Sequence, residues 1–115
     1  MGQQYPLRIS ITGKEHSIGI GKGVIQALGS PKCICILKSK DKDSIAIVPC
    51  DEREYLSVYV PYSLLSNRHK KLRVYSRAFT DEIIFANDFH YDKANIVKGS
   101  YSEEMNAVIF PLKVF

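Results

Sequence analysis

The amino-acid sequence predicts a mainly β protein of the α+β class, in which two β-β-α-β-β units form one small barrel or sandwich. Three observations lead to this prediction. Apolar and polar residues alternate in several segments with the period of two that half-buried strands show. Two short stretches with helical spacing lie between these segments, and the element order of residues 5–50 returns in residues 55–113. A chain of 115 residues has the size of one domain, so residues 1–115 are expected to form a single domain from these two halves.

The first half, residues 5–50, is expected to contain four strands and one helix. The alternation from Tyr5 to Ile11 indicates a half-buried strand that ends at a turn. The helix ends at Gly29, and Pro31 prevents its continuation. The polar residues 39–43 have the length and composition of a hairpin loop between two β-rich runs. The expected elements are strands over residues 5–11, 17–20, 32–38 and 44–49, and a helix over residues 21–28.

The second half, residues 55–113, repeats this order with different residues. Its helix is longer, and Asp81 and Glu82 are expected in the first turn, where they favour the positive end of the helix dipole. A polar segment that includes residues 102–104 separates the last two β-rich runs and predicts a second hairpin. The expected elements are strands over residues 56–60, 72–76, 94–98 and 107–111, and a helix over residues 77–88.

Neither half is able to bury its apolar residues alone. A unit of about 50 residues cannot cover both faces of two hairpins with one short helix. The halves are therefore expected to share one core, with the helices packed across its ends, and pairing of two copies into a homodimer stays open. The residues expected in the shared core are Ile9, Ile11, Ile18, Val24, Leu28, Ile34, Ile36, Ile45, Ile47, Val74, Ile83, Ile96, Val108 and Phe110.

The charge balance favours an anionic partner. The chain has 16 Lys and Arg against 12 Asp and Glu, a formal net charge of +4, and its pI is near 9.0. Such a charge suits contact with nucleic acid, and it also serves solubility alone. The longest apolar runs fall far short of the roughly 20 residues that cross a bilayer, so no membrane partner is expected. The N-terminal residues lack a basic region followed by a long apolar stretch, which predicts a cytoplasmic location.

No catalytic residue, metal site or cofactor is expected, and the protein is predicted not to be an enzyme. Cys33 and Cys35 alternate along an expected strand and lack the Cys-x-x-Cys spacing of structural zinc sites. Together with Cys50 they are expected to be free thiols. The acidic residues fall in turns or in the link between the halves, and no Ser or Cys stands in the motif of an activated nucleophile.

One stretch of the first half carries a resemblance to a known family. Residues 17–29 form a strand and a short helix that ends in Leu-Gly, and a hairpin that ends at residues 45–49 follows Pro31. This order resembles the swapped-hairpin unit of AbrB/SpoVT-type transition-state regulators over residues 7–50. The repeated order resembles the tandem arrangement of MraZ-type regulators. The resemblance implies a swapped-hairpin-like barrel and a small DNA-binding transcriptional regulator.

The sequence departs from this family where the family contacts DNA. The acidic residue, glycine and arginine that usually precede the first helix are replaced by residues 14–17, and the proline that commonly starts this helix is Gly21. Since the family uses those arginines on DNA, the resemblance implies the fold more strongly than it implies the DNA contacts.

Basic residues concentrate just before the strand expected at residues 72–76. Such a cluster neutralises phosphates, and duplex DNA is the expected partner. Tyr62 and Tyr75 are placed to stack on bases beside it, although tyrosines in short strands are commonly half-buried. The alternative for the cluster is a solvated link between the halves. The expected nucleic-acid-binding residues are Arg68, Lys70, Lys71 and Arg73, with Arg8 and Lys22 as lesser contacts.

A glycine-rich turn indicates a second, different function. Gly21, Lys22 and Gly23 lie where a strand meets a helix, a place where backbone N–H groups and the helix dipole hold anions. The turn lacks the dinucleotide fingerprint, because Val24 stands where that motif has glycine, and no Gly-Lys-Ser/Thr triplet exists. A tight turn that needs glycine is the structural alternative. The second candidate function is a non-enzymatic binder of a small anionic nucleotide signal or of a protein partner, of the kind that phages and mobile elements encode.

Overall fold

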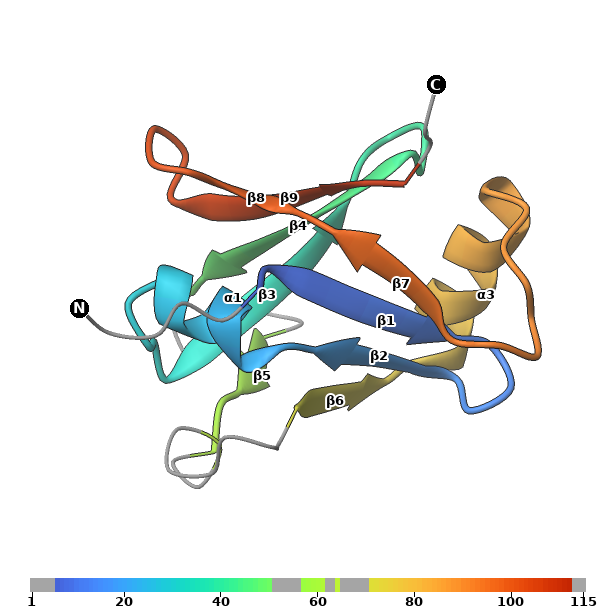
Figure 1. The fold of residues 1–115 in the computed structure, drawn as a ribbon, viewed down its shortest axis with the longest axis horizontal. Coiled ribbons are helices and arrows are strands. Elements are labelled where there is room, and N and C mark those ends of the chain that lie inside the picture. The colour runs from blue at the N-terminus through green and yellow to red at the C-terminus, as the bar shows by residue number, and fades with distance from the viewer. Residues whose placement is uncertain (1–5, 51–56, 62–63, 65–70, 113–115) are drawn as a thin grey trace.

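The chain folds into two antiparallel β-sheets that face each other, so the prediction of a mainly β protein is confirmed (Figure 1). The computed structural model describes residues 6–50, 57–61, 64 and 71–112. Sheet A has the strand order β6 (Leu72–Tyr75), β2 (Ser17–Ile20), β1 (Arg8–Thr12) and β7 (Asn95–Lys98). Sheet B has the order β5 (Ser57–Tyr59), β3 (Cys33–Lys38), β4 (Ser44–Pro49), β9 (Ala107–Pro111) and β8 (Ser100–Ser102). Helix α1 covers Lys22–Ala27 and helix α3 covers Arg77–Ala86.

The two halves of the chain interlock within each sheet. The β1–β2 hairpin lies at the centre of sheet A, and the β3–β4 hairpin lies inside sheet B. Strands of the second half flank both hairpins. Ile36 of β3 pairs with Ile47 of β4, which confirms the hairpin predicted around residues 39–43. The second half therefore completes both sheets around the hairpins of the first half.

Of the two expected architectures, a barrel or a sandwich, the two sheets form a sandwich and no closed barrel. Among the described strands, none pairs across from sheet A to sheet B. The pairing does not confirm the predicted repeat either, because β1 pairs with β2 in one sheet whereas β5 and β6 lie in different sheets. Each hairpin of the first half offers two free edges, and the later strands pair with those edges instead of with each other.

The hairpin predicted between residues 94–98 and 107–111 is wrong. β7 pairs with β1, while β9 pairs with β4 and with the unexpected strand β8. The chain passes from sheet A to sheet B at Gly99, whose N–H donates to the carbonyl oxygen of Leu7 at 2.8 Å. A Cβ atom on Gly99 would lie 2.5 Å from the ring of Phe110, so this crossing accommodates only glycine.

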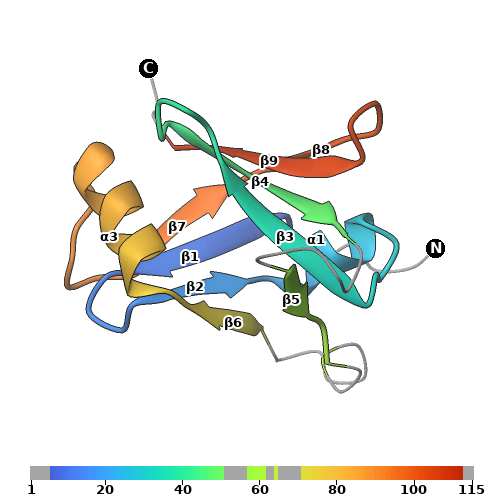
Figure 2. The ribbon, with the colours of Figure 1, turned by 180° about the vertical axis from the view of Figure 1, so that it is seen from behind.

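Helices α1 and α3 lie at opposite ends of the sandwich (Figures 1 and 2). Helix α3 is capped by Ser76, whose Oγ accepts a hydrogen bond from the N–H of Phe79 at 3.3 Å. Because α3 begins at Arg77, Asp81 and Glu82 lie in its second turn, and the prediction that they occupy the first turn is wrong. In the described part of the chain, neither helix has the length and apolar character that a membrane span requires.

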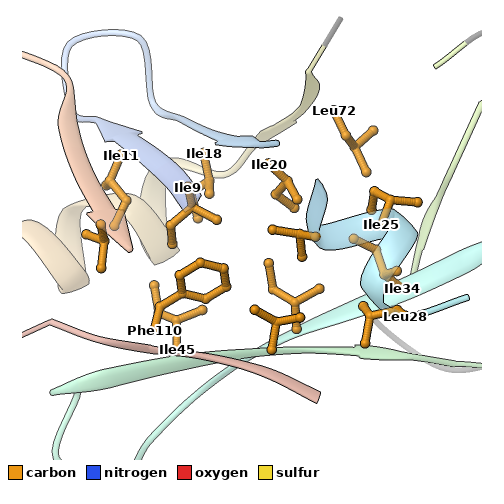
Figure 3. Packing of buried hydrophobic residues seen from close by; sticks show 14 of the residues in the cluster. Ile9, Ile11, Ile18, Ile20, Ile25, Leu28, Ile34, Ile45, Leu72 and Phe110 are labelled. Atoms are coloured by element: carbon orange, nitrogen blue, oxygen red, sulfur yellow. The ribbon is translucent and has the colours of Figure 1, made fainter. Parts of the chain in front are cut away.

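The core between the sheets is built from both halves of the chain (Figure 3). Ile36 and Val74 are only partly buried at its margin. The placement of Ile96 in the core is wrong: in the β1–β7 register Ile9 lies opposite Val97, so Val97 points inward and Ile96 is 62% exposed. The predicted core residues that are confirmed as buried are Ile9, Ile11, Ile18, Val24, Leu28, Ile34, Ile45, Ile47, Ile83, Val108 and Phe110.

Glu82 ties helix α3 to the β3–β4 hairpin. Its carboxylate accepts a hydrogen bond from Lys38 Nζ and forms an ion pair with Lys42 Nζ at 2.8 Å. The hydrogen bond from Lys38 and then that from Lys42 lower the pKa of Glu82 from 4.5 to about 2. The Nδ2 group of Asn87 adds a hydrogen bond to the carbonyl oxygen of Lys42 at 2.8 Å.

We expect Phe110→Ala to lower the free energy of unfolding by about 3–5 kcal/mol, because it leaves a cavity at a fully buried position. Urea denaturation followed by circular dichroism measures the change. Phe85→Ala is the matched control: Phe85 is 71% exposed, and its loss should change stability by only about 0.5 kcal/mol. Equal effects of the two substitutions would contradict the assignment of the core.

We expect Glu82→Gln to lower the melting temperature at neutral pH and to match the wild type near pH 2. The folded-state pKa lies below the ordinary value of 4.5, so the carboxylate stabilises the fold above that pH and this contribution is lost as the pH falls toward 2. Thermal unfolding between pH 2 and 7 measures the difference. Glu104→Gln, at an exposed turn, is the control. If the difference in melting temperature between Glu82→Gln and the wild type did not depend on pH, the ion pairs of Glu82 with Lys38 and Lys42 would be ruled out as its cause.

Candidate nucleic-acid interface

The outer surface of sheet A carries the candidate site. The β1 side chains Ile9 and Ile11 point into the core, so Arg8 and Ser10 point outward. The strand registers place outward residues of the other three strands beside them. We call this surface the basic face, and it consists of Arg8, Ser10, Gly19, Lys71, Arg73, Tyr75, Ile96 and Lys98.

Positive charge is concentrated on the basic face. Arg8 lies directly opposite Lys98 across the β1–β7 ladder, and like charges in this position repel each other. None of the four strands of sheet A contains Asp or Glu. Within the part of the chain that the structure describes, no ion pair involves Arg8, Lys71 or Lys98. These cations therefore face solvent without an acidic partner from the described residues.

A shallow hollow of about 100 Å³ lies between two of these cations. Arg8 and Lys71 line it, together with Ser10 and Gly19. A Cβ atom on Gly19 would lie 2.7 Å from Ser10 Oγ and 3.6 Å from Lys71 Cδ, so the absence of a side chain at this position keeps the hollow open. The other residues that line it are Ile9, Gly21 and Ile96.

Arg73 differs from the other cations of the face because it has a partner. Its Nη1 group donates to Glu15 Oε2 at 3.1 Å, and both side chains are more than half exposed. Glu15 belongs to the turn between β1 and β2. An exposed pair of this kind contributes at most about 1 kcal/mol, so an anionic ligand is able to compete for Arg73.

The structure brings together some of the predicted nucleic-acid-binding residues. Arg8 and Lys71 line one hollow, and Arg73 lies on the same face. Lys22 begins helix α1 and does not line the hollow. Arg68 and Lys70 lie outside the described residues, as does Tyr62.

Sequence reasoning missed four members of the basic face. Ser10 and Gly19 lie on it because they alternate with buried residues of β1 and β2. Ile96 and Lys98 join it because β7 pairs with β1, and no local pattern in the sequence reveals that pairing. The alternation within residues 95–98 was the available signal, since Lys98 must point to the same side as Ile96. Tyr75, which was considered for base stacking, is 68% exposed at the edge strand β6.

The glycine-rich turn serves the fold. The Gly21 N–H donates to the carbonyl oxygen of Arg8 at 3.2 Å, and the Gly21 carbonyl oxygen accepts from the N–H of Val24 at 3.1 Å. The φ angle of Gly21 is −67°, which any residue adopts. Close approach explains the glycine instead, since a Cβ atom would lie 3.1 Å from the Arg8 carbonyl oxygen. Gly23 is buried in helix α1.

None of the three cysteines forms a disulfide bond in the described part of the chain. Cys33 and Cys35 are buried in β3, and Cys50 is half-buried. Over the described ranges, no group of three His, Cys, Asp or Glu side chains is arranged to hold a metal ion.

Comparison of the chain with protein-family models, with curated proteins and with solved structures found no match. The resemblance to AbrB/SpoVT-type regulators therefore stays a prediction.

Proposed function

We propose that this protein binds nucleic acid through the basic face of sheet A. The observation that carries the proposal is the group of Arg8, Lys71 and Lys98, which lie on one face without an acidic partner among the described residues. Cations in this arrangement repel each other, and phosphate groups relieve that repulsion. The net charge of +4 favours the same class of partner.

The hollow between Arg8 and Lys71 supplies a position for one backbone phosphate. Arg8 and Lys71, which line it, carry the cations that bind phosphate, and Ser10, which also lines it, has a hydroxyl that donates a hydrogen bond. Phosphate contacts fix the position of a nucleic acid without reading its sequence. The resemblance implies that such binding regulates transcription, and we include this role in the proposal. Pairing of two copies into a homodimer is also part of the proposal.

The size of the hollow weighs against a nucleotide signal held between Arg8 and Lys71. Small-molecule pockets span about 300–1,000 Å³, whereas this hollow has about 100 Å³. Lys22, the cation expected to capture such a ligand, does not line it. These observations support an extended ligand over a compact one.

We expect the affinity for a mixed oligonucleotide pool to fall by about 100-fold between 50 and 200 mM salt, because about four phosphates are neutralised. Arg8→Gln and Lys71→Gln should each weaken binding and reduce the salt slope by about 1. Fluorescence anisotropy measures both quantities. Lys40→Gln makes the same charge change in the exposed β3–β4 loop of sheet B and should leave the slope unchanged. An equal effect at all three positions, or no binding at low salt, would refute the proposal.

We expect Glu15→Gln to strengthen binding a few-fold. The substitution releases Arg73 from its ion pair and removes a negative charge beside the basic face. The melting temperature should hardly change, since exposed pairs contribute at most about 1 kcal/mol. Anisotropy titration at constant salt measures the affinity, and Glu104→Gln in the β8–β9 turn is the control for net charge. An equal gain in both variants would show that only the net charge matters.

A further inference from the structure

The width of sheet A bears on the form of nucleic acid that the basic face accepts. Neighbouring strands lie about 4.8 Å apart, so the outer backbones of a four-stranded sheet are about 14 Å apart. The major groove of B-DNA is about 12 Å wide and admits a helix or a two-stranded ribbon. The β1–β2 hairpin is no free ribbon, because β6 and β7 flank it on both sides (Figure 1). The face is therefore too broad to reach the base edges of a duplex.

Exposed apolar side chains lie on the same face as the cations. Tyr75 on β6 is 68% exposed, and Ile96 on β7 is 62% exposed. They occupy the two edge strands of sheet A, which also carry Arg73 and Lys98. Arg8, Ser10 and Gly19 lie between them on the two central strands. A ligand that contacts the face only through its phosphates leaves these apolar side chains without a partner. Unpaired bases are a suitable partner, because they offer a flat surface for stacking.

Apolar grooves open between the two sheets beside both edge strands of sheet A. The groove beside β6 has about 280 Å³ and is lined by Tyr75, Val74 and Phe79, among others. The groove beside β7 has about 480 Å³, and its lining includes Ile96 and Phe89. Both exceed the central hollow of about 100 Å³. These grooves reach the basic face only at its edges, through Tyr75 and Ile96. A single strand that presents a phosphate to the hollow therefore has apolar surface for its bases at either edge.

We propose that the ligand of the basic face is single-stranded rather than duplex nucleic acid, with unpaired bases stacked against Tyr75 and packed against Ile96. This inference rests on the proposed function. In a duplex the bases are paired and stacked on one another, so neither side chain reaches them. In a single strand the bases are free to turn toward both edges while Arg8 and Lys71 hold the phosphate between them.

The test compares binding of the full-length protein to a labelled 12-nucleotide single strand of mixed sequence and to the duplex of that sequence. Anisotropy at 50 mM salt measures both affinities, and an RNA strand of the same sequence separates DNA from RNA as the source. We expect either single strand to bind at least about tenfold more tightly than the duplex. Duplex binding that is equal or tighter would overturn the single-strand assignment and leave nucleic-acid binding intact. Absence of binding to every form would refute the proposed function itself.

Tyr75→Leu isolates the stacking step. The substitution keeps an apolar side chain and removes the ring, so single-strand affinity should fall by about fivefold or more while duplex binding and melting temperature stay unchanged. Tyr59→Leu is the matched control, since Tyr59 is 65% exposed on β5 of sheet B and does not belong to the basic face. Equal losses in the two variants would overturn the role of Tyr75.

Discussion

The packing of two apolar sheet faces against each other is the constraint on which the rest of this structure depends. Ile9, Ile11, Ile18 and Ile20 of sheet A face Phe110, Ile45 and other buried side chains of sheet B (Figure 3). Because side chains alternate along a strand, burying Ile9 and Ile11 obliges Arg8 and Ser10 to point outward. A slip of one residue in register would move the apolar set into solvent, so the core fixes the register and thereby the composition of the basic face.

The order of strands in the chain explains why this core needs both halves. Each hairpin of the first half has one apolar side and two unpaired edges, and strands of the second half occupy all of those edges. The same arrangement places β7 beside β1 and thereby sets Lys98 opposite Arg8. The basic face therefore combines residues far apart in the sequence, and it exists only in the complete fold.

The sequence was sufficient to predict the elements that show a local pattern, namely most of the strands and the β3–β4 hairpin. Alternation located the strands of both halves, and the polar loop at residues 39–43 located the β3–β4 hairpin, because both signals lie within a few residues. The position of β7 was not predictable in this way, since its partner β1 lies about 90 residues earlier in the chain. The exposure of Ile96 was missed for the same reason. Strand β8 was missed for a different reason: its partner β9 is close in the chain, but its three residues are mostly polar and show no apolar alternation. At the candidate site, the concentration of charge in the sequence was enough to predict Arg8 and Lys71. The placement of Lys98 depends on the pairing of β7 with β1, which is not local in the sequence.

The distribution of ion pairs separates the charges that stabilise the fold from those that lack an acidic partner among the described residues. Lys38 and Lys42 converge on Glu82 and hold helix α3 against sheet B. On sheet A, by contrast, Arg8 and Lys98 are set side by side, an arrangement that costs stability in the isolated protein. Twelve acidic residues are present in the chain, yet none lies in the four strands of this sheet. Stability alone gives no reason for such a face, whereas an anionic ligand turns its repulsion into attraction.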